Sequence, residues 1–302
     1  MSNLELAVKY LAGERLIGTA AERLALEQFA DGLGSSANGT TYNTPTIVST
    51  PTTPSGLGDN AVQFNGTDQY ILVPANANML QGLSECCITF WINPDNFSSM
   101  TSPVGQFESA LTDGSTIKAE LDTDQKMNYR LRSTNNQGTV YNGGTSVNSA
   151  GSWSFCVMNF YATYKMKCYI NGSADSAGEV TFANDMRANA NSGKLSIGGN
   201  YNDGSFTEQC PCKLTDISIW SRKLTEAEIT ALWNGGDGAL VSSLSDQSGL
   251  RTYWDCQSIE STTFTNDAIT SYPNLPNGAI FEESNTGDHH MFDGTNTWNE
   301  VT

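Results

Sequence analysis

A series of short segments in which apolar and polar residues alternate constrains the fold of this chain more than any other feature. The segments are rich in aromatic and β-branched residues, and turn residues such as Asn65-Gly66 and Asn171-Gly172 separate them. Alternation at a period of two is typical of β-strands, and Gly or Asn adopts the positive φ of a tight reversal at little cost. We therefore expect an all-β fold, a two-sheet antiparallel sandwich or jelly roll, from AVQFNG, YILVP, CCITFWINP, MNYRLRS, SWSFCVMNFY, KMKCYINGS, KLSIGGN and LTDISIW.

A short capped helix is predicted directly after the last of these strands. Thr225 and Glu228 have the spacing of a capping box, in which each side chain binds a backbone N–H group at the start of a helix. The sequence Asn-Gly-Gly at 234–236 then supplies a helix stop. Each part of this passage has a structural reason, so we interpret it as the element that closes the sandwich.

Composition divides the chain into four parts. Residues 1–31 have the apolar spacing and Ala, Leu and Glu content of a helical attachment segment. Residues 32–54 are rich in Gly, Ser, Thr and Pro and predict a linker with one short strand, TIVST. Residues 55–260 hold the strand-rich domain, and residues 261–302 form a C-terminal extension with a hairpin.

The charge of the chain disfavours two classes of partner. Its formal net charge is −17, which repels nucleic-acid backbones and anionic lipid headgroups. No run of apolar residues approaches the roughly 20 that a membrane-spanning helix needs, so we expect no membrane insertion. Divalent cations, neutral glycans and other proteins remain open as partners.

The seven cysteines are predicted to be buried free thiols. Their number is odd, and they lack the tight spacing of a small disulfide scaffold. Cys86 and Cys87 are adjacent, so in a strand they would point to opposite faces. Metal or redox chemistry at Cys210 and Cys212 is the alternative, but no second cysteine pair stands at zinc-finger spacing.

The order of several segments resembles the laminin-G-like domains of the concanavalin A-like lectin/glucanase superfamily. The resemblance implies a concanavalin A-like jelly roll with one concave and one convex sheet and a short helix after the last strand of the motif. It also implies binding of glycans or proteins, often with calcium. The resembling segments are GLGDNAVQFNGTDQYILVP (56–74), ITFWINP (88–94), GSWSFCVMNFYATYKMKCYING (151–172), GKLSIGGN (193–200) and LTDISIWSRKLTEAEITALWNGG (214–236).

Hydrolytic members of this superfamily carry a Glu-x-Asp-x-x-Glu strand whose two glutamates act as nucleophile and acid. The corresponding segment here is AELDTDQ, in which Glu120 and Asp122 are present but Gln125 replaces the second glutamate. His289 and His290, the two histidines of the chain, lie in a Gly- and Asp-rich hairpin that suits no catalytic triad. We expect no enzymatic activity and no catalytic residue.

Calcium is the one ionic cofactor that the resemblance implies. Its ligands would be Asp59 and Asn60 from the Gly-Asp-Asn corner, together with Asp216 at the start of DISIW. Calcium takes six to eight oxygen ligands, and an acidic chain supplies them freely. The alternative is that Asp216 caps a turn and Asp59 solvates a loop.

The loop GNYNDGSF is the best candidate for glycan binding. Tyr201 could stack on a sugar ring, while Asn200, Asn202 and Asp203 offer hydrogen bonds. The same residue types also build ordinary hairpins, so a purely structural loop is the alternative.

The ends of the chain resemble structural proteins of marine phages and archaeal viruses. VKYLAGERLIGTAAERLAL (8–26) is similar to their N-terminal segments, and AIFEESNTGDHHMFDGTNTWNEV (279–301) is similar to a small hairpin module near their C-termini. The resemblance implies a virion location and a homo-oligomeric capsid decoration, spike or fibre protein. The N-terminal segment would bind other virion proteins, and the jelly roll would touch host glycans. The alternative is a carbohydrate-binding or adhesion module of a secreted or cell-surface protein.

Overall fold

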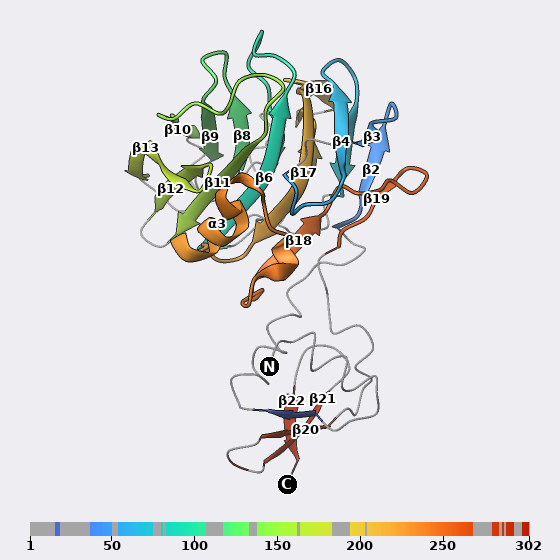
Figure 1. The fold of residues 1–302 in the computed structure, drawn as a ribbon, viewed down its shortest axis with the longest axis vertical. Helices are drawn as coiled ribbons and strands as arrows, with labels where there is room; N and C mark the ends of the chain where they lie inside the picture. The colour runs from blue at the N-terminus through green and yellow to red at the C-terminus, as the bar shows by residue number, and fades with distance from the viewer. Residues whose placement is uncertain are drawn as a thin grey trace.

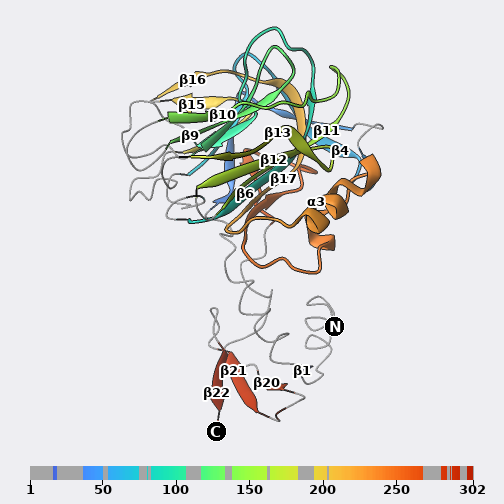
Figure 2. The same ribbon diagram turned by 90° about the vertical axis from the view of Figure 1, so that its left-hand side faces the viewer.

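The computed structural model contains two antiparallel β-sheets packed face to face, with a helix on the outside of one of them (Figure 1; Figure 2). The structure describes residues 16–18, 37–49, 54–74, 80, 83–106, 117–132, 138–161, 164–182, 194–202, 204–267, 280–283, 286, 288–292 and 298–301. The predicted two-sheet jelly-roll sandwich is confirmed.

Each sheet of the sandwich has eight strands in the described part of the chain. The first sheet contains, in spatial order, β10 (Gly138–Tyr141), β9 (Met127–Arg132), β8 (Ile117–Leu121), β7 (Val104–Gln106), β14 (Leu195–Ile197), β5 (Tyr70–Val73), β2 (Gly39–Tyr42) and β19 (Thr263–Phe264). The second contains β13 (Ser173–Thr181), β12 (Lys165–Ile170), β11 (Ser154–Tyr161), β6 (Cys86–Pro94), β17 (Pro211–Trp220), β4 (Asn60–Asn65) and β3 (Thr46–Ser49), with β18 (Leu250–Trp254) paired to β17. A short hairpin of β15 (Asn200–Asn202) and β16 (Ser205–Thr207) follows β14.

Strand β6 lies at the centre of the second sheet and is buried on both faces. All nine of its residues are buried. Ile88 and Phe90 belong to the core between the two sheets, whereas Cys87 and Trp91 belong to a second apolar layer on the outer face of the second sheet. This outer layer includes side chains from helix α3 (Glu226–Trp233) and the 3-10 helix η5 (Val241–Ser243). The continuous apolar run CCITFWI is the expected sequence of a strand covered from both sides.

The cysteines are buried free thiols, as predicted. All seven are buried and none forms a disulfide. Cys86 faces the inner core and Cys87 the outer layer, so the adjacent pair does point to opposite faces. Burial raises the pKa of Cys86 to about 12, which keeps this thiol protonated near neutral pH.

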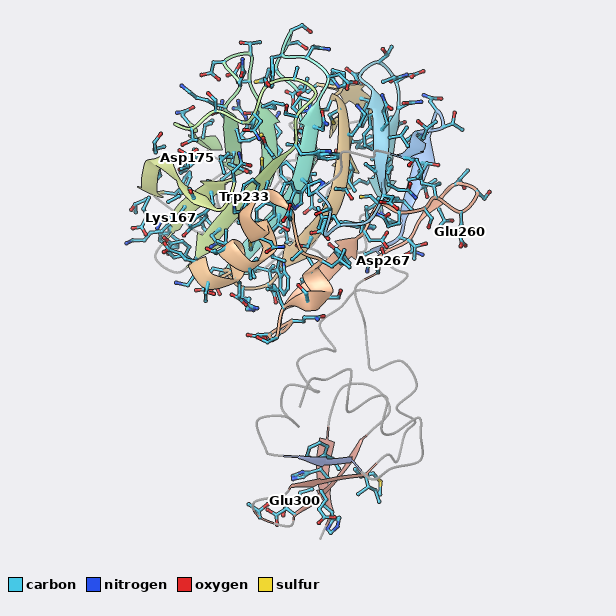
Figure 3. The ribbon with its side chains drawn as sticks, in the orientation of Figure 1. Lys167, Asp175, Trp233, Glu260, Asp267 and Glu300 are labelled. Atoms are coloured by element: carbon cyan, nitrogen blue, oxygen red, sulfur yellow. The ribbon has the colours of Figure 1, made fainter. Side chains whose placement is uncertain are left out.

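Helix α3 has the caps that its sequence predicts. The Thr225 hydroxyl accepts a hydrogen bond from the Glu228 N–H at 3.2 Å, and the Glu228 carboxylate accepts one from the Thr225 N–H at 2.7 Å. Asn234 ends the helix in the left-handed conformation, with φ 45° and ψ 47°. Trp233, labelled in Figure 3, stacks on Trp91 with ring centroids 5.2 Å apart, so the helix end is anchored to β6.

The sandwich begins before, and ends after, the boundaries expected from composition. Strands β2 and β3 come from the predicted linker at 32–54, and β3 coincides with the predicted strand TIVST. At the other end, β19 lies beyond residue 260 and pairs with β2. Composition could not show that these strands belong to the sandwich, because contacts between residues distant in sequence hold them there. The hydroxyl and N–H groups of Thr41, for example, both donate to the carbonyl of Thr262, 221 residues away.

A small separate sheet joins the two ends of the chain. Strand β1 (Leu16–Gly18) pairs in parallel with β20 (Ile280–Glu283), which continues antiparallel to β21 (His289–Phe292) and β22 (Trp298–Val301). Both views place this sheet away from the sandwich (Figure 1; Figure 2). Apart from Leu16–Gly18, the predicted helical segment at 1–31 lies outside the described residues.

The described residues include no helix that is both long and apolar enough to cross a bilayer.

Replacing Thr225 with Ala should lower the free energy of unfolding by about 1 kcal/mol, because the Glu228 N–H loses its acceptor at the helix start. Chemical denaturation would measure the change. Thr230→Ala is the matched control on the same helix, since the Thr230 hydroxyl donates only to the Glu226 carbonyl, at 2.8 Å. Equal losses in both variants would contradict a capping role.

Candidate functional site

Strand β8, which carries Glu120, holds a partly buried ion network. Glu120, on β8, is 1% exposed and accepts hydrogen bonds from Lys118 at 2.9 Å and Arg130 at 3.1 Å. Lys118 also binds both oxygens of Glu208, at 2.9 and 2.6 Å. Asp122 binds the Thr123 N–H group and the Asn128 amide instead of facing Glu120. Glu120 is therefore held in ion pairs with two cations.

The three predicted calcium ligands have separate roles in the structure. Asp59 is exposed. The side-chain amide of Asn60 donates to the Gln257 carbonyl at 3.1 Å, so its nitrogen is fixed by the protein. Asp216 is 1% exposed and accepts a hydrogen bond from the Tyr253 hydroxyl at 2.6 Å. No group of three or more His, Cys, Asp and Glu side chains within the described ranges is arranged to hold a metal. Calcium at these residues stays a prediction.

Asp216 is an unusual buried carboxylate. It has a positive φ of 50° at an irregular point of β17, where the pairing register with β6 shifts between Thr215 and Ser218. Its second oxygen is buried and has no hydrogen-bond partner in the described structure. Burial raises the pKa of Asp216 to about 7, although the hydrogen bond from Tyr253 opposes this rise. We interpret Asp216 as a group whose charge destabilises the fold.

The predicted glycan loop corresponds to the β15–β16 hairpin. Asn200 is only 2% exposed. Tyr201 is half-buried, and Lys194 Nζ lies 4.9 Å from the centre of its ring. Asn202 is the last residue of β15, and Asp203 lies outside the described residues. Of these four residues, only Tyr201 has a side chain that the structure describes as partly exposed.

The structure adds an aromatic group beside this hairpin that the sequence did not reveal. Phe206 lies opposite Tyr201 in the hairpin and stacks on Tyr70 with ring centroids 3.8 Å apart. Tyr70 also stacks on Tyr42 at 4.7 Å, and Tyr42 is 40% exposed. This rim aromatic group comes from β2, β5 and β16. Its rings are largely engaged with one another.

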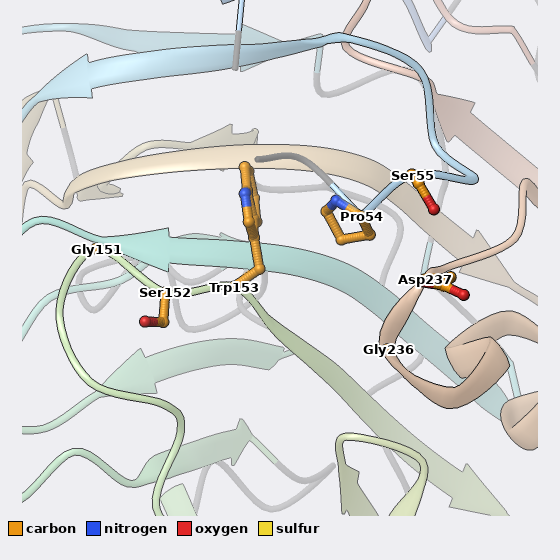
Figure 4. A pocket seen from close by; sticks show the side chains of 7 residues that line it. All are labelled: Pro54, Ser55, Gly151, Ser152, Trp153, Gly236 and Asp237. Atoms are coloured by element: carbon orange, nitrogen blue, oxygen red, sulfur yellow. The ribbon is translucent and has the colours of Figure 1, made fainter. Parts of the chain in front are cut away.

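A hollow lies on the outer side of the second sheet, at the end of α3 (Figure 4). We call it the Trp153 pocket. Its volume is about 520 Å³, within the range of sites for small ligands. The Trp153 ring stands beside Pro54, and the hydroxyl of Ser55 and the carboxylate of Asp237 lie together on one side (Figure 4). The complete lining is Pro54, Ser55, Gly151, Ser152, Trp153, Gly236 and Asp237.

Backbone hydrogen bonds fix the loops around this pocket. The Gly56 N–H donates to the Asp237 carbonyl at 2.7 Å, which joins the segment before β4 to the turn after α3. The Gly151 N–H donates to the Pro94 carbonyl at 2.8 Å, which holds the loop before β11 against the end of β6. The pocket is therefore preformed by three segments that are distant in sequence.

The polar groups of the Trp153 pocket suit an uncharged polyhydroxyl ligand. Trp153 is 9% exposed, and its indole N–H group is buried without a hydrogen-bond partner in the described residues. Aromatic rings pack against the C–H faces of sugars, and carboxylate and hydroxyl groups bind sugar hydroxyls. Sequence reasoning missed this pocket because Ser55, Trp153 and Asp237 become neighbours only in the folded chain.

The two-sheet architecture defines a lectin-like jelly-roll domain. Residues 65–230 match the family model described as the concanavalin A-like lectin/glucanases superfamily (Laminin_G_3). This match covers more than half of the chain, which therefore belongs to that superfamily. No curated protein matches the sequence.

Solved structures with this fold include clostridial toxin binding domains. The binding domain of Paraclostridial Mosquitocidal Protein 1 is 15% identical with a TM-score of 0.50, over 69% of this chain and 53% of that one. The binding domain of Botulinum neurotoxin DC in complex with rat synaptotagmin II is 14% identical with a TM-score of 0.48, over 65% of this chain and 46% of that one. The chain thus spans about half the length of these structures, and the likeness concerns the fold.

Replacing Asp216 with Asn should make the protein more stable than wild type at alkaline pH. The pKa of Asp216 in the folded protein, about 7, lies above its ordinary value of 3.8. Proton binding by Asp216 therefore stabilises the native state fully below about pH 4, and this stabilisation is lost as the pH rises through about 7. The stability difference between variant and wild type should grow by up to about 4 kcal/mol over this range. Urea denaturation across pH would measure it.

The exposed residue Asp124 provides the control, because Asp124→Asn removes one carboxylate without removing a buried one. The gain in stability that we attribute to removal of a buried charge should be specific to Asp216→Asn. A flat profile for Asp216→Asn would contradict our interpretation of this carboxylate.

Proposed function

We propose that this chain is a non-enzymatic lectin-like module and that the Trp153 pocket binds a neutral sugar. The observation that carries the proposal is a preformed hollow of about 520 Å³ in which an indole ring, two serines and a carboxylate meet. Membership of a superfamily described by lectins and glucanases supports carbohydrate as the ligand class. The net charge of −17 disfavours an anionic ligand at a pocket whose one ionisable lining residue is Asp237.

A binding role is better supported than hydrolysis. The described carboxylate of the corresponding hydrolase strand, Glu120, is ion-paired to Lys118 and Arg130 in a buried network. A glycosidase needs a second carboxyl group about 5–10 Å from the first, free to bind the substrate. Gln125 replaces the second glutamate of that motif.

We also propose that the module is carried by a virion structural protein, with host glycans as its target. Support comes from the resemblance of both chain ends to viral structural proteins and from the separate sheet that β1 forms with β20. Antibodies raised against the sandwich should label virus particles in cultures that produce this protein. Absence of label on purified particles would favour the alternative, a secreted or cell-surface adhesion module.

Replacing Asp237 with Ala should raise the dissociation constant for a neutral glycan at least about tenfold, because hydrogen bonds to a charged group contribute about 1.5–3 kcal/mol. A glycan array would identify the ligand, and titration calorimetry would measure the loss. Asp237 is exposed, so the variant should fold normally.

Two control variants distinguish the Trp153 pocket from the rim aromatic group and from a general effect of removing negative charge. Asp124→Ala removes an exposed carboxylate from the β8–β9 turn and should leave binding unchanged. Tyr201→Ala tests the β15–β16 hairpin, where Tyr201 lies opposite Phe206 of the rim aromatic group. Loss of binding in Tyr201→Ala but not in Asp237→Ala would move the site to the β15–β16 hairpin, and absence of any bound glycan would contradict the proposal.

A further inference from the structure

A second hollow lies on the outer face of the second sheet, over β11, β12 and β13. Its volume is about 300 Å³, and the segment that leads into α3 forms one wall. Figure 3 shows Lys167 on β12 at this side of the sandwich. The side chains that give the hollow its chemistry are Tyr161, Lys167, Tyr169, Glu179, Lys223 and Glu226.

Two similar groups of side chains lie around this hollow. In one, Glu179 binds Lys165 at 2.6 Å and accepts a hydrogen bond from the Tyr161 hydroxyl. In the other, Glu226 binds Lys167 at 2.7 Å and accepts a hydrogen bond from the Tyr169 hydroxyl at 3.2 Å.

Strand register explains why these groups gather. Residues 165, 167 and 169 lie on the same face of β12, because side chains alternate along a strand. Tyr161 lies directly opposite Lys165 in the β11–β12 pair, and Lys167 lies directly opposite Glu179 in the β12–β13 pair. Cross-strand neighbours on one face are close enough to interact.

Lys223 is the one lining charge that forms no ion pair with another described residue. Its ammonium group lies 4.7 Å from the centre of the Tyr161 ring, and none of the ion pairs between described residues includes it. The other lining charges are Lys167, Glu179 and Glu226, so the lining side chains carry no net charge, and Lys165 lies beside the hollow, paired with Glu179. The hydrogen bond from Lys165 lowers the pKa of Glu179, and that from Lys167 lowers the pKa of Glu226, so both carboxylates stay ionised. Lys223 therefore supplies an ammonium group with which an anionic ligand can pair.

We propose that this hollow binds an acidic monosaccharide unit, whose carboxylate contacts Lys223 and Lys167. Hydrogen bonds between ammonium and carboxylate groups are charge-assisted and favour this anion. Glu179 and Glu226 accept hydrogen bonds from the sugar hydroxyls, which explains why an anion-binding hollow also contains carboxylates. The site lies apart from the Trp153 pocket, shares none of its lining residues and does not depend on the neutral-sugar proposal.

Titration of the full chain with methyl β-glucuronide tests this proposal, with methyl β-glucoside as the uncharged match and glucose 6-sulfate as the alternative anion. Calorimetry should show binding of the glucuronide that weakens with added salt, because the charges are partly exposed. The glucoside should bind at least about tenfold more weakly, since it cannot make the charge-assisted contacts.

Lys223→Gln should weaken glucuronide binding about fivefold or more. Lys213→Gln is the matched control, because it removes one positive charge from Lys213, which is paired with Asp95 at 3.0 Å outside this hollow. Asp237→Ala should leave glucuronide binding unchanged, which separates this site from the Trp153 pocket.

Several outcomes would overturn the proposal. These are equal affinity for glucuronide and glucoside, preference for the sulfated sugar, or equal effects of Lys223→Gln and Lys213→Gln.

Discussion

The burial of β6 on both faces is the constraint on which the rest of the structure depends. Strand β6 lies between β11 and β17, so three long strands share one continuous apolar surface on each side. The outer surface can stay buried only if α3 and η5 cover it. Within this apolar layer, the hydroxyls of Thr89 and Ser218 hydrogen-bond at 2.6 Å, and Ser218 also accepts a hydrogen bond from the Trp220 indole at 2.8 Å. These three polar side chains are thus paired with one another, whereas the indole N–H groups of Trp91 and Trp153 in the same layer have no hydrogen-bond partner among the described residues.

The sequence was informative where structure is determined locally. The alternating segments and the capping box at Thr225 and Glu228 each depend on residues a few positions apart, and the structure confirms both. The assignment of β2 to a linker failed for the opposite reason, since its partners β5 and β19 are remote, and its Thr and Tyr residues, although common in strands, lie in a segment rich in Gly, Ser and Pro. The virion role depends on resemblance at the chain ends and stays a proposal.

The candidate sites were harder to predict than the fold. Tyr201 is a sequence prediction because aromatic and polar residues adjoin in one loop, whereas the nearby rim aromatic group, Tyr42, Tyr70 and Phe206, comes from three separate strands. The Trp153 pocket likewise needs three loops to meet. Asp216 resembled a ligand in sequence, yet burial beside Tyr253 gives it a different environment, which only the folded chain defines.

Helix α3 connects the two proposed binding sites. The turn at its C-terminus supplies Gly236 and Asp237 to the Trp153 pocket, and the segment at its N-terminus supplies Lys223 and Glu226 to the second hollow. The element that covers β6 therefore also forms walls of both hollows. Its anchoring through Trp233 and Trp91 fixes the position of both walls relative to the sheet.

The pairing of β2 with β19 also determines the order in which the protein can fold during synthesis. Strand β2 leaves the ribosome before the partner on its outer edge, Thr263–Phe264, which is made more than 200 residues later. Until then, one edge of the first sheet exposes unpaired backbone groups, which is the kind of surface that recruits strands from other chains. The nascent protein must therefore hold an incomplete sandwich until β19 has been made.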